Sequence, residues 1–299
     1  MNHPTEFFTR PVAITLLILA ATIFAGNHIG ARFAFDNGAG LLLAVLARSA
    51  MALIFMLTIV KLRQASMVIP KHQRSWQLLI GFLITGQSLS LYSAINLIPI
   101  PLALLIVNTW PMMFILANWA TGKRLPNLKT FLFLIIIVTG LFFALDVNSK
   151  LEISQQWLQG VMLAFISAIL LTFIMWLTQY QLAGIAGSVR SSYTMLIAVI
   201  LMLMAGALDV LPGGINLPNN TTGWMGLLSL AVLYGIAITL LFVLTPKLDM
   251  ARNSPMLNFE PVASLVLSYL FLGQVLTSHQ MFGGVLVLMG IIAIGFSRA

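Results

Sequence analysis

The chain is a succession of apolar runs, each close to bilayer length and each separated from the next by a short polar break. A spanning helix needs about 20 apolar residues, because the hydrocarbon core of a bilayer is about 30 Å thick. The breaks contain Pro, Asn, Gly or charged residues, which end or interrupt helices. The pattern therefore predicts an all-α membrane protein with ten transmembrane helices. Their expected bounds are Val12–Ala34, Ala39–Val60, Trp76–Asn96, Leu102–Thr121, Thr130–Leu145, Trp157–Tyr180, Val189–Leu211, Trp224–Thr245, Met256–Leu272 and Ser278–Phe296.

The composition points to the same class. Hydrophobic residues make up 60% of the 299 residues and charged residues 7%, whereas a soluble domain carries about 25% charged residues. The lipid bilayer is therefore an expected partner, and the spans and their loops leave no room for a separate soluble domain. The chain has no cysteine, which excludes disulfides, thiolate metal sites and cysteine nucleophiles. We expect no cofactor and no metal site.

The formal net charge of +8 is typical of nucleic-acid binding proteins, but the basic residues lie in loops between the apolar runs. Twelve of the 15 fall on one side of the predicted topology, two fall on the other, and Arg48 lies within the second span. This bias predicts an inner-membrane protein with both termini in the cytoplasm and argues against nucleic acid as a partner. It also requires the first run to be an uncleaved signal-anchor rather than a cleaved secretory signal. The twelve are Arg10, Lys61, Arg63, Lys71, Arg74, Lys123, Arg124, Lys129, Arg190, Lys247, Arg252 and Arg298, and the two are Arg32 and Lys150.

The two halves of the chain share residues at a fixed spacing of 150 positions. The pairs are Asn108 and Asn258, Pro111 and Pro261, and Gly140 and Gly290. Because each half holds five predicted spans, an odd number, the halves must cross the membrane in opposite orientations. Equivalent loops differ accordingly, since the 61–74 loop holds four basic residues and its counterpart at 211–223 holds none. The sequence therefore predicts two inverted five-helix repeats, 1–147 and 148–299, within one membrane domain.

Short motifs within this repeat carry a resemblance to a known family. Residues 24–27 read F-A-G-N. The run from Leu91 to Leu125 has small residues, then a proline, and ends in G-K-R-L. In the second half, residues 259–261 read F-E-P and residues 272–276 read L-G-Q-V-L. These features resemble the W-G-x-N, E-P and G-E-R-L patterns of the ten-span, EamA-type proteins of the drug/metabolite transporter superfamily. Lys123 and Gln274 depart from the Glu of G-E-R-L, Phe24 departs from Trp, and Trp110 stands opposite Glu260. The resemblance implies transport of a small organic metabolite, with export of an amino acid or a related metabolite as the common role.

Two charged residues inside predicted spans are the sharpest site candidates. A charge within a spanning helix costs about 2.5–3.5 kcal/mol on insertion scales, so it is retained where it faces water or a partner. Glu260 lies about 8 Å into the ninth span at 1.5 Å per residue and could bind a cationic group or a coupling proton; alternatively, it packs the repeats together or reaches the headgroups. Arg48, midway along the second span, could bind an anionic substrate, pair with Glu260 or stabilise helix packing.

The prolines mark a further candidate region. Pro111 and Pro261 remove a backbone hydrogen bond and disfavour regular helix just before them. Broken helices at corresponding places in two halves point to a transporter site, although a packing kink gives the same pattern. Asn108, Trp110 and Asn258 share those turns. Weaker candidates, which often serve merely as hydrogen-bonding contacts between helices or as interfacial anchors, are Asn27, His28, Gln87, Tyr92, Trp176, Tyr193 and Tyr234.

These patterns favour a secondary transporter in which one repeat rocks against the other around a small-molecule substrate. The sequence has no G-x-x-x-x-G-K-[ST] run for nucleotide binding, so any energy must come from an ion gradient, with Glu260 as the proton acceptor, or transport is uncoupled. A non-transporting scaffold or receptor is the first alternative. An intramembrane enzyme is the second, but Glu260 is the one acidic residue deep in a predicted span, so no acidic dyad can form there and we expect no enzyme.

Overall fold

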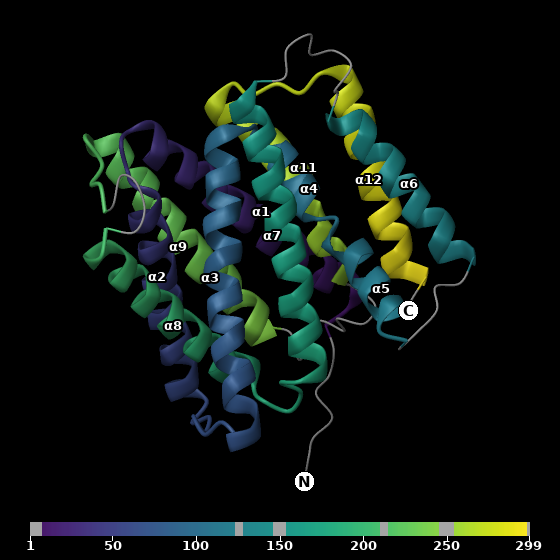
Figure 1. Cartoon of the computed structure of the whole chain (residues 1–299). Coiled ribbons are helices and arrows are strands. Elements are labelled where there is room, and N and C mark those ends of the chain that lie inside the picture. Colours follow the sequence, from purple (N-terminus) through teal and green to yellow (C-terminus); the bar gives the residue numbers. More distant parts are fainter. Residues whose placement is uncertain (1–7, 123–127, 146–153, 210–214, 245–253, 298–299) are drawn as a thin grey trace.

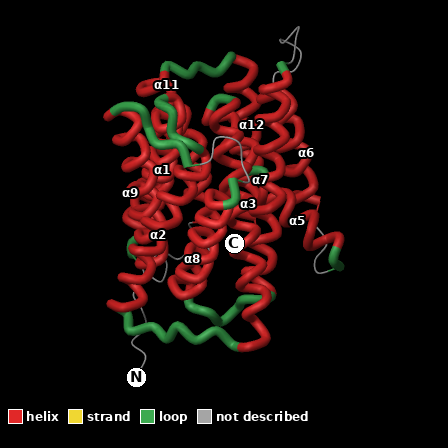
Figure 2. Tube along the Cα trace, turned by 60° about the vertical axis from the view of Figure 1, so that its left-hand side comes forward, coloured by secondary structure: helices red, strands yellow, loops and turns green. Residues whose placement is uncertain are grey.

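The computed structural model describes residues 8–122, 128–145, 154–209, 215–244 and 254–297, and within these ranges it contains helices and loops but no strand (Figures 1 and 2). The basic loop residues Lys123 and Arg124 and the predicted boundary between residues 147 and 148 lie outside the described ranges. The helices are α1 (Arg10–Asp36), α2 (Leu41–Leu62), η1 (Lys71–Gln73), α3 (Arg74–Leu97), α4 (Ile100–Val107), α5 (Trp110–Ala120), α6 (Leu128–Leu145), α7 (Gln155–Tyr180), α8 (Gly187–Ala207), α9 (Thr221–Leu244), η4 (Ser254–Phe259), α11 (Glu260–Leu272) and α12 (Ser278–Ser297).

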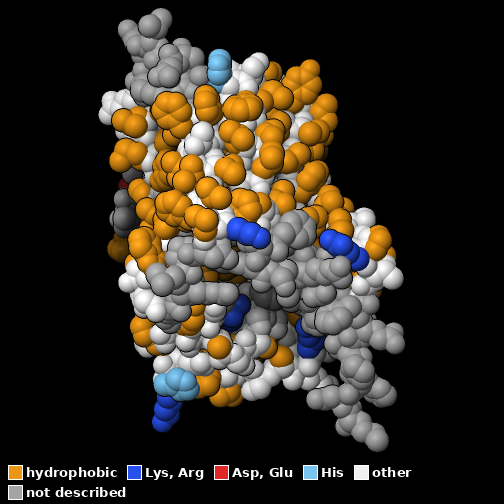
Figure 3. Space-filling view, turned by 90° about the vertical axis from the view of Figure 1, so that its right-hand side faces the viewer, with side chains coloured by type: hydrophobic (Ala, Val, Ile, Leu, Met, Phe, Trp, Pro, Cys, Tyr) orange, Lys and Arg blue, Asp and Glu red, His pale blue; other side chains and the backbone are white. Residues whose placement is uncertain are grey.

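Each of the ten predicted apolar runs contains helix where the structure describes it, and the fourth run is interrupted at residues 108–109. Seven helical segments are long and apolar enough to cross a membrane, with α4 and α5 together forming one of them, and three apolar stretches are shorter, 131–145, 256–272 and 278–293. Large hydrophobic side chains such as Phe131 and Phe142 on α6 and Phe282 on α12 are exposed. Figure 3 shows hydrophobic side chains spread over much of the face that it presents. A surface of this kind suits lipid, not water. The prediction of a multi-pass membrane protein is confirmed.

The closest helix pairs join the two halves of the chain. α1 packs along α9, α3 along α7, α2 along α8, and α6 along α12. If α4–α5 and η4–α11 are each counted as one segment, each segment of the first half has a counterpart five segments later in the second half. Exchanging every segment with its counterpart turns the α1–α9 pair into the α7–α3 pair. The same exchange leaves the α2–α8 and α6–α12 pairs unchanged. The packing therefore has the exchange symmetry expected of two related halves.

Two of these pairs touch backbone to backbone at glycines. A Cβ atom on Gly30 of α1 would lie 2.7 Å from the backbone nitrogen of Leu230 on α9, and one on Gly140 of α6 would lie 2.7 Å from that of Val287 on α12. A Cβ on Gly283 of α12 would meet the backbone nitrogen of Ala144 on α6. Small residues allow this approach and are typical of helix interfaces in membranes.

The helices break at both prolines. α4, the apolar octapeptide I-P-L-A-L-L-I-V, is buried along its whole length and packs against α7 and α11. It ends at Val107, and α5 restarts at Trp110 with Pro111 in its first turn. In the second half, the 3₁₀ helix η4 gives way to α11 at Glu260, again with proline next. Proline has no N–H to continue a preceding helix, which explains both breaks.

The motif glycines of the two halves share one backbone conformation. Gly122 (φ +68°) and Gly273 (φ +62°) are both left-handed, which glycine adopts at no steric cost. Gly273 ends α11, and the side-chain Oε1 of Gln274 then accepts a hydrogen bond of 3.1 Å from the backbone N–H of Ile100 at the start of α4. Gln274, which departs from the family pattern, thus joins the two broken segments.

Candidate functional site

Seven polar side chains from five helices meet inside the bundle. We call this set the central polar cluster; it is supplied by α1, α2, α3, α9 and α11. All of its members are buried except the last, whose side chain is 23% exposed. The members are Asn27, His28, Arg48, Ser88, Tyr92, Tyr234 and Glu260.

Arg48 of α2 is a buried cation held mainly by aromatic rings. Its guanidinium carbon lies 4.0 Å from the ring centre of Tyr234 and 5.3 Å from that of Tyr92, and it donates a hydrogen bond to the hydroxyl of Ser88. Cation–π contacts are worth about 0.5–2 kcal/mol each, comparable with the cost of about 2.5–3.5 kcal/mol for a charge in a span. The rings thus support the charge without supplying a counter-anion.

Arg48 keeps unused hydrogen-bonding capacity. Its Nε is buried and has no hydrogen-bond partner among the described residues. No carboxylate within the described ranges forms an ion pair with it. The side chain is 4% exposed, so bulk water does not readily solvate the group. Arg48 is therefore a preformed cationic site with no counter-anion among the described residues.

Glu260 pairs with His28, and no ion pair between Glu260 and Arg48 is found among the described residues. The Oε1 of Glu260 lies 3.0 Å from the Nε2 of His28 on α1. Glu260 is the first residue of α11, where the N-terminal end of the helix dipole stabilises a carboxylate. The Nδ1 of His28 is buried and has no hydrogen-bond partner in the described part of the chain. This end of the cluster is acidic and partly open.

Tyr92 of α3 contacts both Arg48 and His28, the latter being the partner of Glu260. Its hydroxyl donates a hydrogen bond of 2.7 Å to the Oδ1 of Asn27. The Tyr92 ring centre lies 5.7 Å from the ring of His28, in addition to its contact with Arg48. Phe24, from the F-A-G-N motif, packs edge-on against Tyr234 with ring centres 5.8 Å apart. The cluster thus presents the Arg48 guanidinium and the His28–Glu260 pair around Tyr92.

The candidates at the first helix break serve local contacts. Asn108 donates its side-chain amide to the carbonyl of Leu104 in its own helix, at 2.8 Å. Trp110 packs edge-on against Phe114, and its carbonyl accepts a hydrogen bond of 3.3 Å from Thr172 of α7. Both bonds lie close to the break, and the Leu104 carbonyl also accepts the backbone N–H of Asn108. Neither side chain reaches the central polar cluster through a recorded contact.

The remaining candidates make their side-chain contacts with residues outside the cluster or make none with a described residue. Gln87 donates to Ser167 of α7 at 3.0 Å, and Trp176 packs against Tyr180 with ring centres 5.1 Å apart. Tyr193 of α8 donates to the carbonyl of Met67 at 2.8 Å. Asn258 lies partly buried in η4 and has no recorded hydrogen bond with a described residue. Gln87 and Tyr193 form contacts between segments, the role that polar side chains often have in membranes, whereas the Trp176–Tyr180 contact lies within α7.

Ser88 was not among the site residues predicted from the sequence. It lies four residues before Tyr92 on α3, and residues at that spacing share one face of a helix. Gln87 was predicted as a candidate together with Tyr92, but the helical spacing places Ser88, not Gln87, on the face of Tyr92. Applying the i, i+4 rule to Tyr92 would have found it.

A bundle of membrane-length helices with buried ionisable side chains beside a helix break defines a polytopic membrane protein with an internal polar site. The chain matches the EamA-like transporter family in each half, over residues 11–145 and 158–296, and it belongs to that family. It is accordingly a membrane transporter of the drug/metabolite type, and members of this family are transporters, not enzymes.

Comparison with solved structures supports the fold. One crystal structure, described simply as that of a protein, has a TM-score of 0.67 and 15% sequence identity, and the match covers 95% of this chain and 98% of the other. At that identity the likeness establishes the architecture alone. No curated protein matches the chain.

Proposed function

We propose that this protein is a secondary transporter that moves an amino acid or a related carboxylate-bearing metabolite out of the cell across the inner membrane. In this proposal the chain crosses the membrane ten times as two inverted repeats, 1–147 and 148–299, with both termini in the cytoplasm. Family membership supports the transport role. The exchange symmetry of the helix pairs and the loop distribution of Lys and Arg support the inverted topology.

The observation that carries the proposal is the unneutralised Arg48. A guanidinium with unused donors, held rigidly between two tyrosine rings, suits a carboxylate, because charge-assisted hydrogen bonds from Arg are strong and directional. An amino acid also carries an ammonium group. Glu260, the partly exposed carboxylate of the cluster, would accept that group or a coupling proton. The two ends of the cluster therefore match the two charges of one small substrate.

The helix breaks supply a route for alternating access. α4 begins where α11 ends, as the Ile100–Gln274 hydrogen bond shows, so the two broken segments run side by side. Glu260 lies about 20 Å from the far end of α11 at 1.5 Å per residue. This distance is shorter than the hydrocarbon thickness of about 30 Å, which places Glu260 within the bilayer in this proposal. Transporters commonly place their substrate at such discontinuous helices. We infer that rearrangement at these breaks exposes the cluster to each side in turn.

A ligand screen followed by flux measurements tests the function. We expect an amino acid to raise the melting temperature of the purified protein, because a ligand that binds the folded state stabilises it by mass action. The same compound should then exchange across proteoliposomes, whereas its amine analogue without the carboxylate should do neither. If no carboxylate-bearing compound binds and no flux is seen, the scaffold or receptor alternative is favoured.

Replacing Glu260 with glutamine tests the acidic end of the cluster. Glutamine keeps the shape of the side chain but cannot take up and release a proton or neutralise an ammonium group. We expect Glu260→Gln to abolish the pH dependence of transport in proteoliposomes and to lower the transport rate at least about tenfold, the effect of losing one charged hydrogen bond. The measurement is initial uptake rate against pH, with and without an imposed pH gradient.

The matched control for this variant is Asp36→Asn, since Asp36 lies exposed at the end of α1 in a surface pair with Arg32. It should transport like the unaltered protein. A folded Glu260→Gln protein with unchanged rate and unchanged pH dependence would remove Glu260 from the site.

A further inference from the structure

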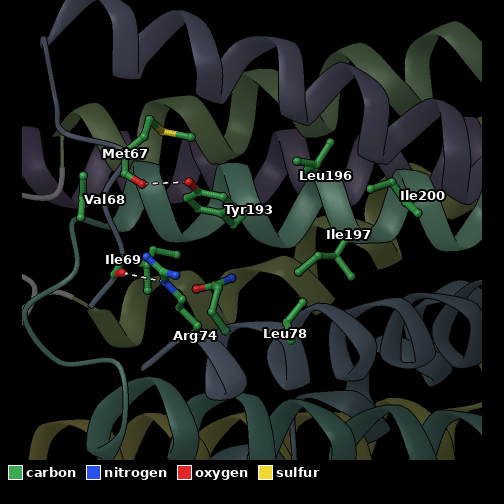
Figure 4. Close-up of a pocket in the computed structure, with 10 residues that line it drawn as sticks. Met67, Val68, Ile69, Arg74, Leu78, Tyr193, Leu196, Ile197 and Ile200 are labelled. Atoms are coloured by element: carbon green, nitrogen blue, oxygen red, sulfur yellow. Dashed lines mark hydrogen bonds between the residues drawn. The ribbon is translucent and has the colours of Figure 1, made fainter. Parts of the chain in front are cut away.

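A cavity lies on the outside of the bundle, between α3 and α8. We call it the α3–α8 groove; its volume is about 540 Å³, and the segment 67–69 closes one end (Figure 4). The volume lies in the range of about 300–1,000 Å³ found for ligand sites. The groove shares no lining residue with the central polar cluster. It is therefore a separate site.

The walls of the groove are apolar and open towards lipid. Leu78 on α3 is 53% exposed, and Leu196 and Ile200 on α8 are 41% and 46% exposed. On membrane-spanning helices, exposed apolar side chains of this kind face acyl chains. Tyr193 to Ile200 spans about 10 Å of helix, so the groove has room for a segment of chain running along the helix axis.

One end of the groove is cationic and anchored. The Nε of Arg74 donates a hydrogen bond of 3.2 Å to the carbonyl of Ile69, and Tyr193 donates to that of Met67 (Figure 4). These two bonds hold the closing segment against α3 and α8. The terminal nitrogens of Arg74 have no acceptor among the residues that the structure describes. Lys71, one turn earlier, is also exposed.

A buried acceptor beside this cation is also unused. Gln77 lines the groove, is 2% exposed and donates its amide N–H groups to the carbonyl of Arg190 and the hydroxyl of Thr194. Its Oε1 is buried and has no hydrogen-bond partner in the described ranges. Because Gln77 and Arg74 are three residues apart on α3, they share one face of the helix. The groove therefore combines an exposed guanidinium with a buried acceptor that has no donor among the described residues.

We propose that the α3–α8 groove binds an anionic phospholipid. The phosphate lies at Arg74 and Lys71, a headgroup hydroxyl donates to Gln77, and the start of an acyl chain fills the apolar part between Leu78 and Ile200. Charge complementarity selects this occupant, since basic pockets between membrane helices attract anionic headgroups. A soluble anion would leave the apolar length empty. A zwitterionic lipid would bring its own cation to two basic side chains.

The test is the lipid dependence of the melting temperature of the purified full-length protein in detergent. Phosphatidylglycerol is titrated against phosphatidylcholine with the same acyl chains and against inorganic phosphate. We expect stabilisation by phosphatidylglycerol, a clearly smaller effect of phosphatidylcholine and none of phosphate. Arg74→Gln should weaken the phosphatidylglycerol response at least about fivefold, since each basic residue near anionic lipid contributes about that factor. Lys61→Gln, another exposed basic residue at the end of α2 outside the groove, should leave it unchanged.

A second, neighbouring pair of variants tests the apolar part without touching a charge. Leu78→Trp fills the groove and should abolish retention of phosphatidylglycerol in native mass spectrometry. Leu79→Trp, one position along α3 and also exposed but not lining the groove, should retain the lipid. The proposal is overturned if phosphate stabilises as well as the lipid, if the two lipids act equally, if folded Arg74→Gln responds normally, or if the two tryptophan variants behave alike.

Discussion

Substituting Arg48 by glutamine is expected to weaken binding of a carboxylate-bearing substrate by about ten- to hundredfold. Losing one hydrogen bond between charged groups changes a dissociation constant by about this factor. Glutamine retains a donor for the hydroxyl of Ser88 but removes the cation that Tyr92 and Tyr234 enclose. The unpaired Nε, which we assign to the substrate, is lost as well. Substrate affinity is measured by ligand-induced thermal stabilisation of the purified variant.

Two further variants separate binding from packing. Arg48→Lys keeps the charge but not the planar fork, so it should bind more weakly than the unaltered protein and more tightly than Arg48→Gln. Arg10→Gln, an exposed arginine at the start of α1, should change nothing. If folded Arg48→Gln binds the substrate within about twofold of the unaltered protein, against the expected loss of a charged hydrogen bond, then Arg48 is a packing residue and the site lies elsewhere.

Adding a single methyl group at Gly283 is expected to destabilise the protein by about 1–3 kcal/mol, the usual cost of overpacking a close contact. The new Cβ of Gly283→Ala would meet the backbone nitrogen of Ala144 and the carbonyl of Gly140 on α6. Backbone atoms cannot rotate away as a side chain can. The α6 and α12 helices must therefore separate, with loss of contact along the whole pair.

The adjacent residue provides a matched control. A Cβ on Gly284 would make an ordinary contact of 3.8 Å with the side chain of Leu105. Because Ala favours helix over Gly by about 1 kcal/mol, Gly284→Ala should be neutral or stabilising. The two variants are compared by melting temperature in the same detergent. Equal behaviour would show that the α6–α12 contact tolerates a wider spacing and that the glycine contact does not hold the pair together.

Local chemistry in the sequence was enough to predict the helices and their interruptions. Apolar length identified the helical runs, and the missing N–H of Pro111 and Pro261 predicted the breaks that precede α5 and α11. The equivalence of Gly122 and Gly273 also has a physical basis, since both adopt positive φ. Short-range rules sufficed because these features depend on neighbouring residues in the chain.

The arrangement of the site depended on long-range packing and was harder to predict. Arg48 and Glu260 stood out as charges within apolar runs, but nothing local indicated that α1 would place His28 against Glu260, 232 residues away. Gln87 and Tyr193 looked as promising as Tyr92 because each is a polar side chain in a span. The direction in which such a side chain points depends on the neighbouring helices, and that direction separates the central polar cluster from contacts between helices.

The glycine contacts also constrain how the protein can move. α1 lies against α9 and α6 against α12 with their backbones touching. Helices from residues before 146 therefore pack between helices from residues after 153. Neither half has a complete set of neighbours from its own sequence. We therefore expect the rigid bodies of the transport cycle to be mixed groups, each drawing helices from both halves, so that neither half swings as a block.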